Sequence, residues 1–476
     1  MGKESRKEKR RGSTADADVL LPSAFAAATS QMMGTERWQL FERAMADEPT
    51  VSVRLNPHKI EDKGQPLQVA GIDITDMQPV PWSRHSFYLP RRPLFTADPL
   101  LHAGVYYVQE ASSMFIDTVL RQYVGDNDIV LLDLSAAPGG KATLARTAVS
   151  RGSLVIANEP VRQRAAVLSE NMQKWGAAAV IVTSNYAADI CRTGISFDII
   201  VADVPCSGEG MFRKDPVARR MWSLRTVEQC RRLQRSIVSD IWQCLKPGGL
   251  MIYSTCTFNV DEDENNVMYI ADELGADILP VDIDSSWGIT GSLSSLCNEP
   301  VYRFIPGLTR GEGLFMAVLK KRGQPAADPP QRHSRTSSAT DVPPWLRPDI
   351  AGEMSFTRLG DIITAIPKRW QPLLDTVRGR LNVVHAGITI GTIKGNDIIP
   401  DHSLAMSADI NTAAFNIIDI DNDQATAYLR RQTLQLPPSA ARGHILLTYK
   451  GHPIGFANNI GTRANNMYPK SWRILK

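Results

Sequence analysis

Two cysteines in the middle of the chain lie in similar surroundings. Cys206 follows the apolar run FDIIVADVP, and Cys256 follows the apolar run GGLMIYST. Upstream, the segment DLSAAPGGK (residues 133–141) places a glycine turn after another apolar run. A cysteine thiolate can form a covalent intermediate with an electron-poor carbon. A thiolate, a carboxylate and a bound methyl donor are the three parts that methylation of carbon 5 of a pyrimidine requires.

Carbon 5 of cytosine is a poor nucleophile, so a methyl sulfonium alone does not alkylate it. A thiolate that adds to carbon 6 raises the electron density at carbon 5. An acid or hydrogen-bond donor near ring nitrogen 3 stabilises the developing charge, and Asp203 is the candidate for this role. A base must then remove the carbon 5 proton so that the sulfur can leave. A second cysteine beside the first can assist that release.

A cysteine at the end of a strand is more often a small packing residue than a catalytic group. We expect packing roles for the other four cysteines, which are Cys191, Cys230, Cys244 and Cys297. Cys206 and Cys256 are set apart because each directly follows a strand, where open α/β sheets bind their ligands.

The surrounding sequence predicts an α/β fold. From about residue 128, short apolar runs alternate with helical stretches, which is typical of a parallel sheet with helices on both faces. The expected parallel strands are 129–134, 153–158, 179–184, 197–203 and 250–255. Residues 301–305 and 313–321 are expected to close the sheet as an antiparallel pair. We therefore predict a Rossmann-like methyltransferase domain with a seven-stranded, mostly parallel sheet.

The glycine turn after the first strand is the expected cofactor site. It lets the backbone approach a ligand closely, and Glu159 after the second strand can accept hydrogen bonds from ribose hydroxyls. The turn lacks the GxGxxG spacing of dinucleotide sites. It also lacks the GxxxxGK[ST] pattern of triphosphate loops, since Ala142 follows Lys141.

The segments DLSAAPGGK, VADVPCSGEGMFRKDP and YSTCTFNVDEDENNV resemble the motifs of the Sun-type RNA (cytosine-5) methyltransferase family, over about residues 35–321. The resemblance implies S-adenosylmethionine as cofactor, Cys256 as nucleophile and Cys206 in product release. It implies cofactor contacts at Ser135, Ala136, Ala137, Pro138, Gly139, Gly140, Lys141, Glu159, Asn185 and Asp203. Ser135 departs from the family, which more often has cysteine there. Asn185 stands where the family often has an acid, with Asp189 as a neighbouring candidate.

The roles of the two cysteines can also be exchanged. DNA cytosine-5 methyltransferases use the cysteine of a Pro-Cys motif as nucleophile, and Pro205-Cys206 matches that motif. We prefer Cys256 because the whole pattern resembles the RNA family, and the chemistry alone leaves both assignments open.

Four regions are expected along the chain. Residues 1–100 form a basic tail and an N-terminal RNA-binding subdomain, and residues 101–321 form the methyltransferase domain. Near the boundary between these two regions, Tyr106 or Tyr107 either stacks on a base or packs in the core. Residues 322–344 are rich in Pro, Ser, Ala and charge, as in an exposed linker. Residues 345–476 are expected to form a C-terminal region with a PUA-like RNA-binding domain. Its end, residues 443–474, has short strands, glycine turns and aromatic residues of exposed type among basic residues, and resembles the PUA-like tail of bacterial enzymes that modify small-subunit (16S) ribosomal RNA. The alternative is a small β-barrel that serves only stability.

The distribution of charge favours RNA as the partner, although the net charge is only +3. Met211 to Arg235 holds eight basic residues against Asp215 and Glu228, and Ala441 to Lys476 holds six and no acid. The first eleven residues hold six basic and two acidic residues. Clustered Lys and Arg are typical of phosphate-binding surfaces, although each cluster alone also suits a solvated helix face.

The start of the chain is charged and lacks an apolar signal core, and no run of about 18 apolar residues exists. We therefore expect a cytoplasmic, monomeric protein without a metal. The favoured function is methylation of carbon 5 of a cytosine in RNA, most of all 16S ribosomal RNA. The alternatives are a tRNA cytosine-5 methyltransferase, a non-catalytic RNA-binding protein of ribosome assembly and a small-molecule methyltransferase.

Overall fold

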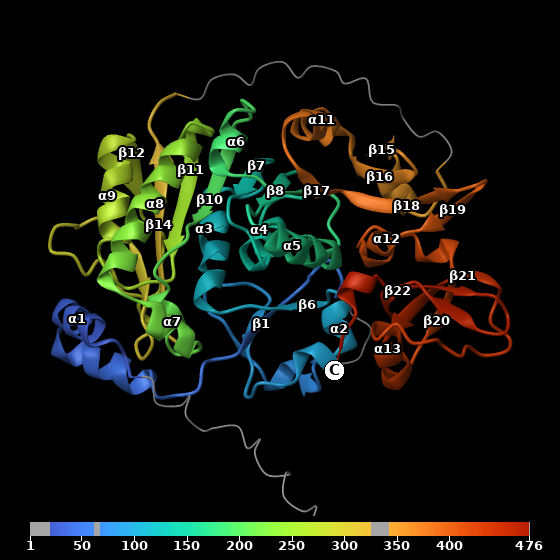
Figure 1. The fold of residues 1–476 in the computed structure, drawn as a ribbon, viewed down its shortest axis with the longest axis horizontal. Helices are drawn as coiled ribbons and strands as arrows, with labels where there is room; N and C mark the ends of the chain where they lie inside the picture. Colours follow the sequence, from blue (N-terminus) through green and yellow to red (C-terminus); the bar gives the residue numbers. More distant parts are fainter. Residues whose placement is uncertain (1–19, 61–66, 325–341, 476) are drawn as a thin grey trace, which may run out of the picture.

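The computed structural model describes residues 20–60, 67–324 and 342–475. A central sheet with helices on both faces forms the middle of the molecule (Figure 1). The N-terminal helix lies at one end, and the C-terminal sheets lie at the other. The basic N-terminal tail and most of the expected linker fall outside the described residues.

Five parallel strands form the middle of the sheet. They are β7 (Val130–Asp133), β8 (Leu154–Asn158), β9 (Val180–Thr183), β10 (Phe197–Asp203) and β11 (Leu245–Thr255). From β7 the chain moves outward through β8 to β9, and then crosses to β10 and β11 on the other side. Open α/β sheets bind ligands beyond the carboxyl ends of the strands at such a reversal, here between β7 and β10.

The predicted Rossmann-like fold is confirmed, but the sheet has nine strands among the described residues rather than the predicted seven. Beyond β11 lie the antiparallel strands β14 (Leu314–Lys321) and β12 (Ala276–Leu279), and β13 (Tyr302–Phe304) pairs with β14. At the other edge, β17 (Val383–Ala386) pairs antiparallel with β9. The short strands β12 and β17 lack the long apolar run that marks a buried strand, so the sequence pattern did not predict them in this sheet.

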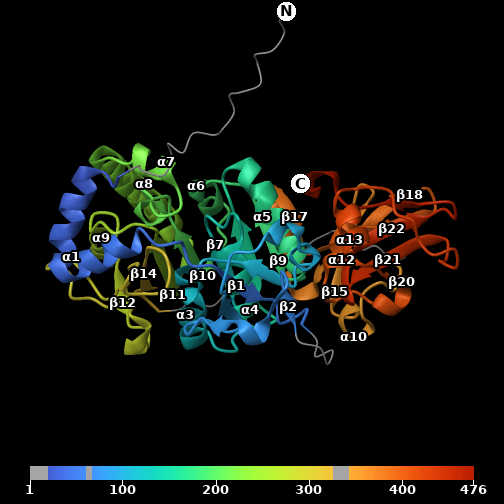
Figure 2. The ribbon, with the colours of Figure 1, turned by 90° about the horizontal axis from the view of Figure 1, so that it is seen from below.

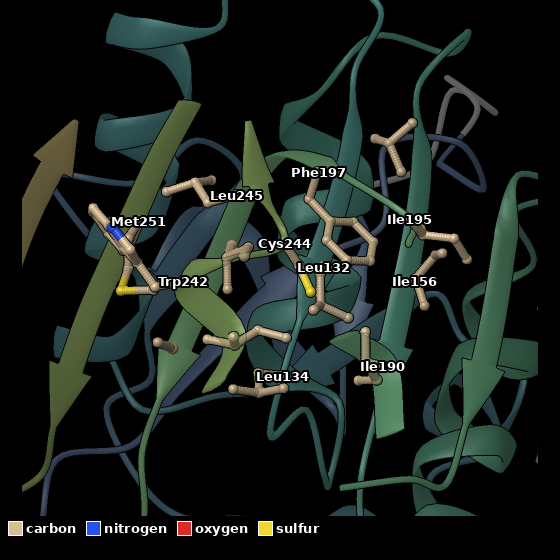
Figure 3. Packing of buried hydrophobic residues seen from close by; sticks show 14 of the residues in the cluster. Leu132, Leu134, Ile156, Ile190, Ile195, Phe197, Trp242, Cys244, Leu245 and Met251 are labelled. Atoms are coloured by element: carbon tan, nitrogen blue, oxygen red, sulfur yellow. The ribbon is translucent and has the colours of Figure 1, made fainter. Parts of the chain in front are cut away.

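Alternate residues of each strand enter the cores on the two faces. In β10, Ile200 and Ala202 belong to one core and Ile199 and Val201 to the other. The first core contains residues of α6 (Ala187–Cys191), α8 (Leu224–Trp242), α9 (Glu264–Glu273) and α11 (Gln371–Arg380) (Figure 3). The opposite face packs on α3 (Ile116–Tyr123), α4 (Gly140–Ala148) and α5 (Arg162–Trp175).

The N-terminal part contributes a helix that is kinked at Gly34 and a small sheet. Helix α1 (Ser23–Ala44) packs its aromatic residues against Phe212, Trp222 and Phe258 near the two cysteine segments. The sheet has the order β4 (Gln78–Pro79), β5 (Ser86–Tyr88), β1 (Ser52–Leu55), β6 (Tyr106–Val108). Strand β6 lies beyond the boundary expected at residue 100, yet it belongs to this N-terminal sheet.

The C-terminal region also crosses its expected boundary. Helix α11 and strand β17 complete the methyltransferase sheet, and Leu374 and Val377 lie in its core. The remaining strands form two further sheets. One contains β15 (Met354–Leu359), β16 (Ile362–Pro367), β18 (Ile388–Lys394) and β19 (Asp397–Pro400), and the other contains β20 (Asn416–Asp419), β21 (Gly443–Tyr449), β22 (His452–Asn459) and β23 (Ala464–Asn466).

Helix α13 (Asn422–Leu429) joins the C-terminal sheet to the N-terminal part. Its residues Ala425, Tyr428 and Leu429 share a core with Val53 and Leu100. The expectation of exposed aromatic residues in this region is wrong for Phe456 and Tyr468, which are buried. Figure 2 shows these parts as one elongated body. No helix in the described ranges is long and apolar enough to cross a membrane.

Candidate active site

The two cysteines lie side by side because their strands are neighbours. Strands β10 and β11 are parallel, with Asp203 opposite Ser254, so the residues that follow each strand lie at the same edge of the sheet. The Sγ atoms of Cys206 and Cys256 are 3.2 Å apart, and both side chains are half-buried. The hydrogen bond to Cys256, together with burial, raises the pKa of the Cys206 thiol. A protonated Cys206 can then donate to the sulfur of Cys256.

Asp203 lies beside a half-buried cation at this edge. Its carboxylate makes a 2.8 Å ion pair with Lys141 Nζ and accepts a 2.6 Å hydrogen bond from Ser254 Oγ. Burial alone would lower the pKa of Lys141, but the Asp203 carboxylate, with Asp133 and Cys256, raises it above its ordinary value. Lys141 is therefore a fixed positive charge between the glycine turn and the cysteines.

A cavity of about 210 Å³ opens beyond the carboxyl ends of β7 and β10. Its wall contains the glycine turn, through Ser135, Ala136, Ala137, Pro138, Gly140 and Lys141, together with Asp203. Gly139 does not line the cavity but begins α4 with φ 122°, a conformation that favours glycine. The cavity is thus built from most of the turn that the sequence indicated.

Asp133 is a wall residue that the sequence analysis did not single out. It ends β7, is fully buried, and neither carboxylate oxygen has a well-aligned donor among the described residues. Burial and the neighbouring Asp203 raise the pKa of Asp133 to about 7, against the opposing effect of Lys141. A buried acceptor without a donor is costly, so this carboxyl group is suited to a ligand that brings hydrogen-bond donors or positive charge.

The opposite wall comes from the N-terminal part of the chain. Tyr107, Val108, Gln109, Glu110 and Ser113 line it, from β6 and the turn that follows. Burial raises the pKa of Tyr107 to about 12, so its phenol stays protonated. Tyr106, the other aromatic candidate, is a core residue and donates its hydroxyl hydrogen to Asp98. Tyr107 was a sequence candidate for stacking on a base, and the folding of β6 against β1 brings it and the other four residues to this wall.

Two expected cofactor contacts lie outside this wall. Glu159 is buried at the end of β8, where Oε1 accepts from the Val161 amide and Oε2 lies 3.4 Å from Arg164. Asn185 bonds through both side-chain groups to the backbone of Asn382. Asp189 accepts from the Tyr186 amide and pairs with Arg192. The side chains of Asn185 and Asp189 are therefore engaged away from the cavity.

Part of the basic segment from Met211 to Arg235 is used inside the protein. Arg213 pairs with buried Glu312, and Arg235 donates to Asn266 Oδ1. Lys214 and Arg225 are exposed. The acidic residues before and in the first turn of α9 are also internal, since Glu264 pairs with buried Arg303.

The site fits S-adenosylmethionine. The turn exposes backbone to a ligand, Asp133 offers unused acceptors to positively charged groups, and Glu159 lies at the strand end where a ribose acceptor is expected. The arrangement can hold a methyl donor next to a carboxylate, a fixed lysine and two thiols.

Comparison with known proteins gives matches along most of the chain. Residues 121–320 match the family described as 16S rRNA methyltransferase RsmB/F. Residues 21–111 match the N-terminal domain of 16S rRNA methyltransferase RsmF, and residues 415–474 match the methyltransferase RsmF PUA domain.

Several relatives are named ribosomal RNA small subunit methyltransferase F. That of Aliivibrio fischeri (strain MJ11) is 28% identical, over 95% of this chain and 98% of its own. That of Aeromonas salmonicida (strain A449) is 29% identical, over 88% of this chain and 90% of its own.

Among solved structures, a methyltransferase homolog protein from Pyrococcus horikoshii aligns with a TM-score of 0.52 at 25% identity, over 63% of this chain and 94% of its own. NSun6 from Pyrococcus horikoshii with SFG, an S-adenosylmethionine analogue, aligns with a TM-score of 0.51 at 19% identity, over 64% of this chain and 99% of its own.

Proposed function

The chain belongs to the 16S rRNA methyltransferase RsmB/F family and is S-adenosylmethionine-dependent, and on this premise we propose that it methylates carbon 5 of a cytosine in small-subunit ribosomal RNA. The match to an RsmF PUA domain and the relatives' names support ribosomal RNA as the substrate. We place the reaction in the cytoplasm.

One observation carries the choice of carbon 5. The Cys206 and Cys256 sulfurs lie 3.2 Å apart at the strand end where Asp203 faces Lys141. Methyl transfer to a nitrogen or an oxygen needs no thiol, because those atoms carry their own lone pairs. Carbon 5 requires prior addition of a nucleophile at carbon 6, and a thiolate performs that addition.

In the proposed reaction, Cys256 adds to carbon 6 of the cytosine and forms a covalent adduct. The cation of Lys141, held in place by Asp203, stabilises the negative charge that develops at ring nitrogen 3, and Asp203 in its protonated form donates a hydrogen bond to that nitrogen. Bound S-adenosylmethionine supplies the methyl group.

Release of the product follows transfer of the carbon 5 proton to a solvent water molecule, which acts as the base. The bond between Cys256 and carbon 6 then breaks, and the double bond of the ring returns. Cys206 is in contact with the Cys256 sulfur and is therefore placed to assist the departure of that thiolate. The contact between the two sulfurs does not by itself distinguish the roles of the two cysteines. Trapping of the adduct in Cys206→Ala or in Cys256→Ala distinguishes them.

The function is tested on the product. The purified protein is incubated with S-adenosylmethionine and either small-subunit ribosomal RNA, assembled small subunits or tRNA, and the digested nucleosides are analysed by mass spectrometry. We expect 5-methylcytidine from ribosomal RNA, at one or few sites in bisulfite sequencing. 5-Methylcytidine found only in tRNA would change the proposed substrate from ribosomal RNA to tRNA. Methylation at another atom, or no methylation, would overturn the proposal.

A further inference from the structure

A buried carboxylate joins the two segments that carry the cysteines. Glu209 lies three residues after Cys206 and is 1% exposed. One of its oxygens, Oε2, accepts from Thr257 Oγ1 at 2.6 Å, from the Phe258 amide at 2.7 Å and from the Asn259 amide at 3.1 Å. These three donors belong to the three residues that directly follow Cys256.

The second oxygen of Glu209 is equally occupied. Oε1 accepts from Trp222 Nε1 and from Asn259 Nδ2, both at 2.9 Å. Five donors thus converge on one carboxylate. No arrangement of a neutral amide satisfies them, because an NH₂ group placed at either oxygen position would face at least two donors.

Further bonds reinforce the same junction. The amide of Gly210 donates to the carbonyl oxygen of Cys256 at 2.8 Å. Glu262 accepts from the Ser207 amide at 3.0 Å and from Asn259 Nδ2 at 2.9 Å. Burial raises the pKa of Glu262. Of the two carboxylates, Glu209 accepts more hydrogen bonds from the segment after Cys256.

We propose that Glu209 is a positioning residue that sets the separation of the Cys206 and Cys256 thiols. It does not touch the reacting atoms. It fixes the backbone just after each cysteine, and through Trp222 it links this junction to the end of α7 (Pro216–Met221) and the core around α1. Its effect on catalysis rests on the proposed function, whereas its effect on the two sulfurs does not.

The separation of the thiols can be measured without RNA. Diamide takes two protons and two electrons from a pair of adjacent thiols, forming a disulfide while it becomes a hydrazine. The linked peptides identify which cysteines have joined, which also distinguishes the neighbouring pair Cys191 and Cys244. The rate at which the Cys206–Cys256 disulfide forms therefore reports how well these two sulfurs are held together.

The variant is Glu209→Gln, and the control is Glu273→Gln at the exposed end of α9. We expect Glu209→Gln to slow the Cys206–Cys256 disulfide at least 10-fold, with the Cys191–Cys244 rate and S-adenosylmethionine affinity within about threefold of wild type. Glu273→Gln should leave all three unchanged. A Cys206–Cys256 rate within twofold of wild type in folded Glu209→Gln would overturn the proposal.

A second variant covers the case that Glu209→Gln does not fold. Thr257→Val removes one donor to Glu209 and keeps the shape of the side chain. We expect an intermediate slowing of the disulfide, about 3-fold or more, with cooperative unfolding retained. A wild-type rate in this variant would contradict the proposal in the same way.

Methylation provides the second readout. A misplaced catalytic group costs on the order of 100-fold, so kcat of Glu209→Gln should fall by about 10- to 100-fold while KM for RNA stays within about threefold. If wild-type protein forms the disulfide quickly but methylates no RNA, the proposed function fails and the positioning role stands. If kcat is unchanged while the disulfide slows, Glu209 does not act on the reaction.

Discussion

At the scale of single residues, Asp133 stands out because it is buried at the cavity with unused acceptors. Its pKa is raised from 3.8 to about 7 by burial and by Asp203. Between these values the folded protein binds a proton that the unfolded chain has released. Its contribution to stability is therefore present at low pH and decreases as the pH rises toward 7.

We predict that Asp133→Asn removes this pH dependence. Each unit of pKa shift corresponds to about 1.4 kcal/mol, so the free energy of unfolding of wild type, relative to the variant, should fall by roughly 1–4 kcal/mol from pH 4 to pH 8. Urea denaturation at several pH values measures it. If the free energies of unfolding of the two proteins change in parallel with pH, Asp133 is already ionised in the folded state.

Calorimetry checks the role of Asp133 in cofactor binding. A positively charged ligand favours the carboxylate, so S-adenosylmethionine should displace a proton near pH 6 in wild type and none in Asp133→Asn. The displaced proton appears as a dependence of the binding enthalpy on the ionisation enthalpy of the buffer. Equal proton release in both proteins would assign the proton to another group.

The sequence located the residues that follow strands, because a strand end is marked by its apolar run. Cys206, Cys256 and Asp203 were found in this way, and the structure brings all three to one edge. Glu209 was not found. Its role depends on contacts between segments that are distant in the sequence, and no local pattern of residues encodes those contacts.

At the scale of elements, α11 and β17 tie the C-terminal region to the methyltransferase sheet. Leu374 and Val377 of α11 are buried in its core, and β17 covers the edge of β9. A cut after residue 344 would therefore remove part of the catalytic domain. The composition of the linker indicated a domain boundary there. Composition does not indicate that the chain after the linker packs again on the methyltransferase sheet.

We predict that Leu374→Ala destabilises the methyltransferase sheet by about 2–5 kcal/mol, as expected for a buried leucine. Faster hydrogen exchange at the amides of β9, a strand more than a hundred residues away in the sequence, measures the effect. Thr376→Ala on the exposed side of the same helix is the control. Unchanged protection of β9 in folded Leu374→Ala would mean that α11 is energetically separate.

At the scale of the whole molecule, the N-terminal subdomain and the PUA-like region share one core, in which α13 packs with Leu100 and Val53. The N-terminal sheet is thus joined to the C-terminal region, whereas α1 packs at the other end of the molecule. Composition predicted both regions, but not this junction, because its apolar residues come from the two ends of the chain.

The basic segment from Ala441 to Lys476 is tested by removing its charges. Deleting the segment would instead expose this shared core. Arg442, Arg463 and Lys470 are exposed, and no acidic residue occurs in this segment. Replacing all three by Gln should lower the log–log salt slope of RNA binding by roughly 0.7–0.9 for each phosphate that is no longer neutralised, with cofactor affinity unchanged. Arg358→Gln, whose arginine faces Asp361, is the control. An unchanged slope would direct the search for the RNA surface to Lys214 and Arg225.

The central claim is a covalent cytosine adduct at Cys256 that Cys206 helps to resolve. The most direct measurement is a denaturing gel of Cys206→Ala, Cys256→Ala and the double variant after incubation with RNA and S-adenosylmethionine. We predict a slowly migrating protein–RNA band for Cys206→Ala and none for the other two. A band for Cys256→Ala with none for Cys206→Ala would exchange the roles, and the absence of any adduct together with wild-type methylation by Cys256→Ala would contradict the account.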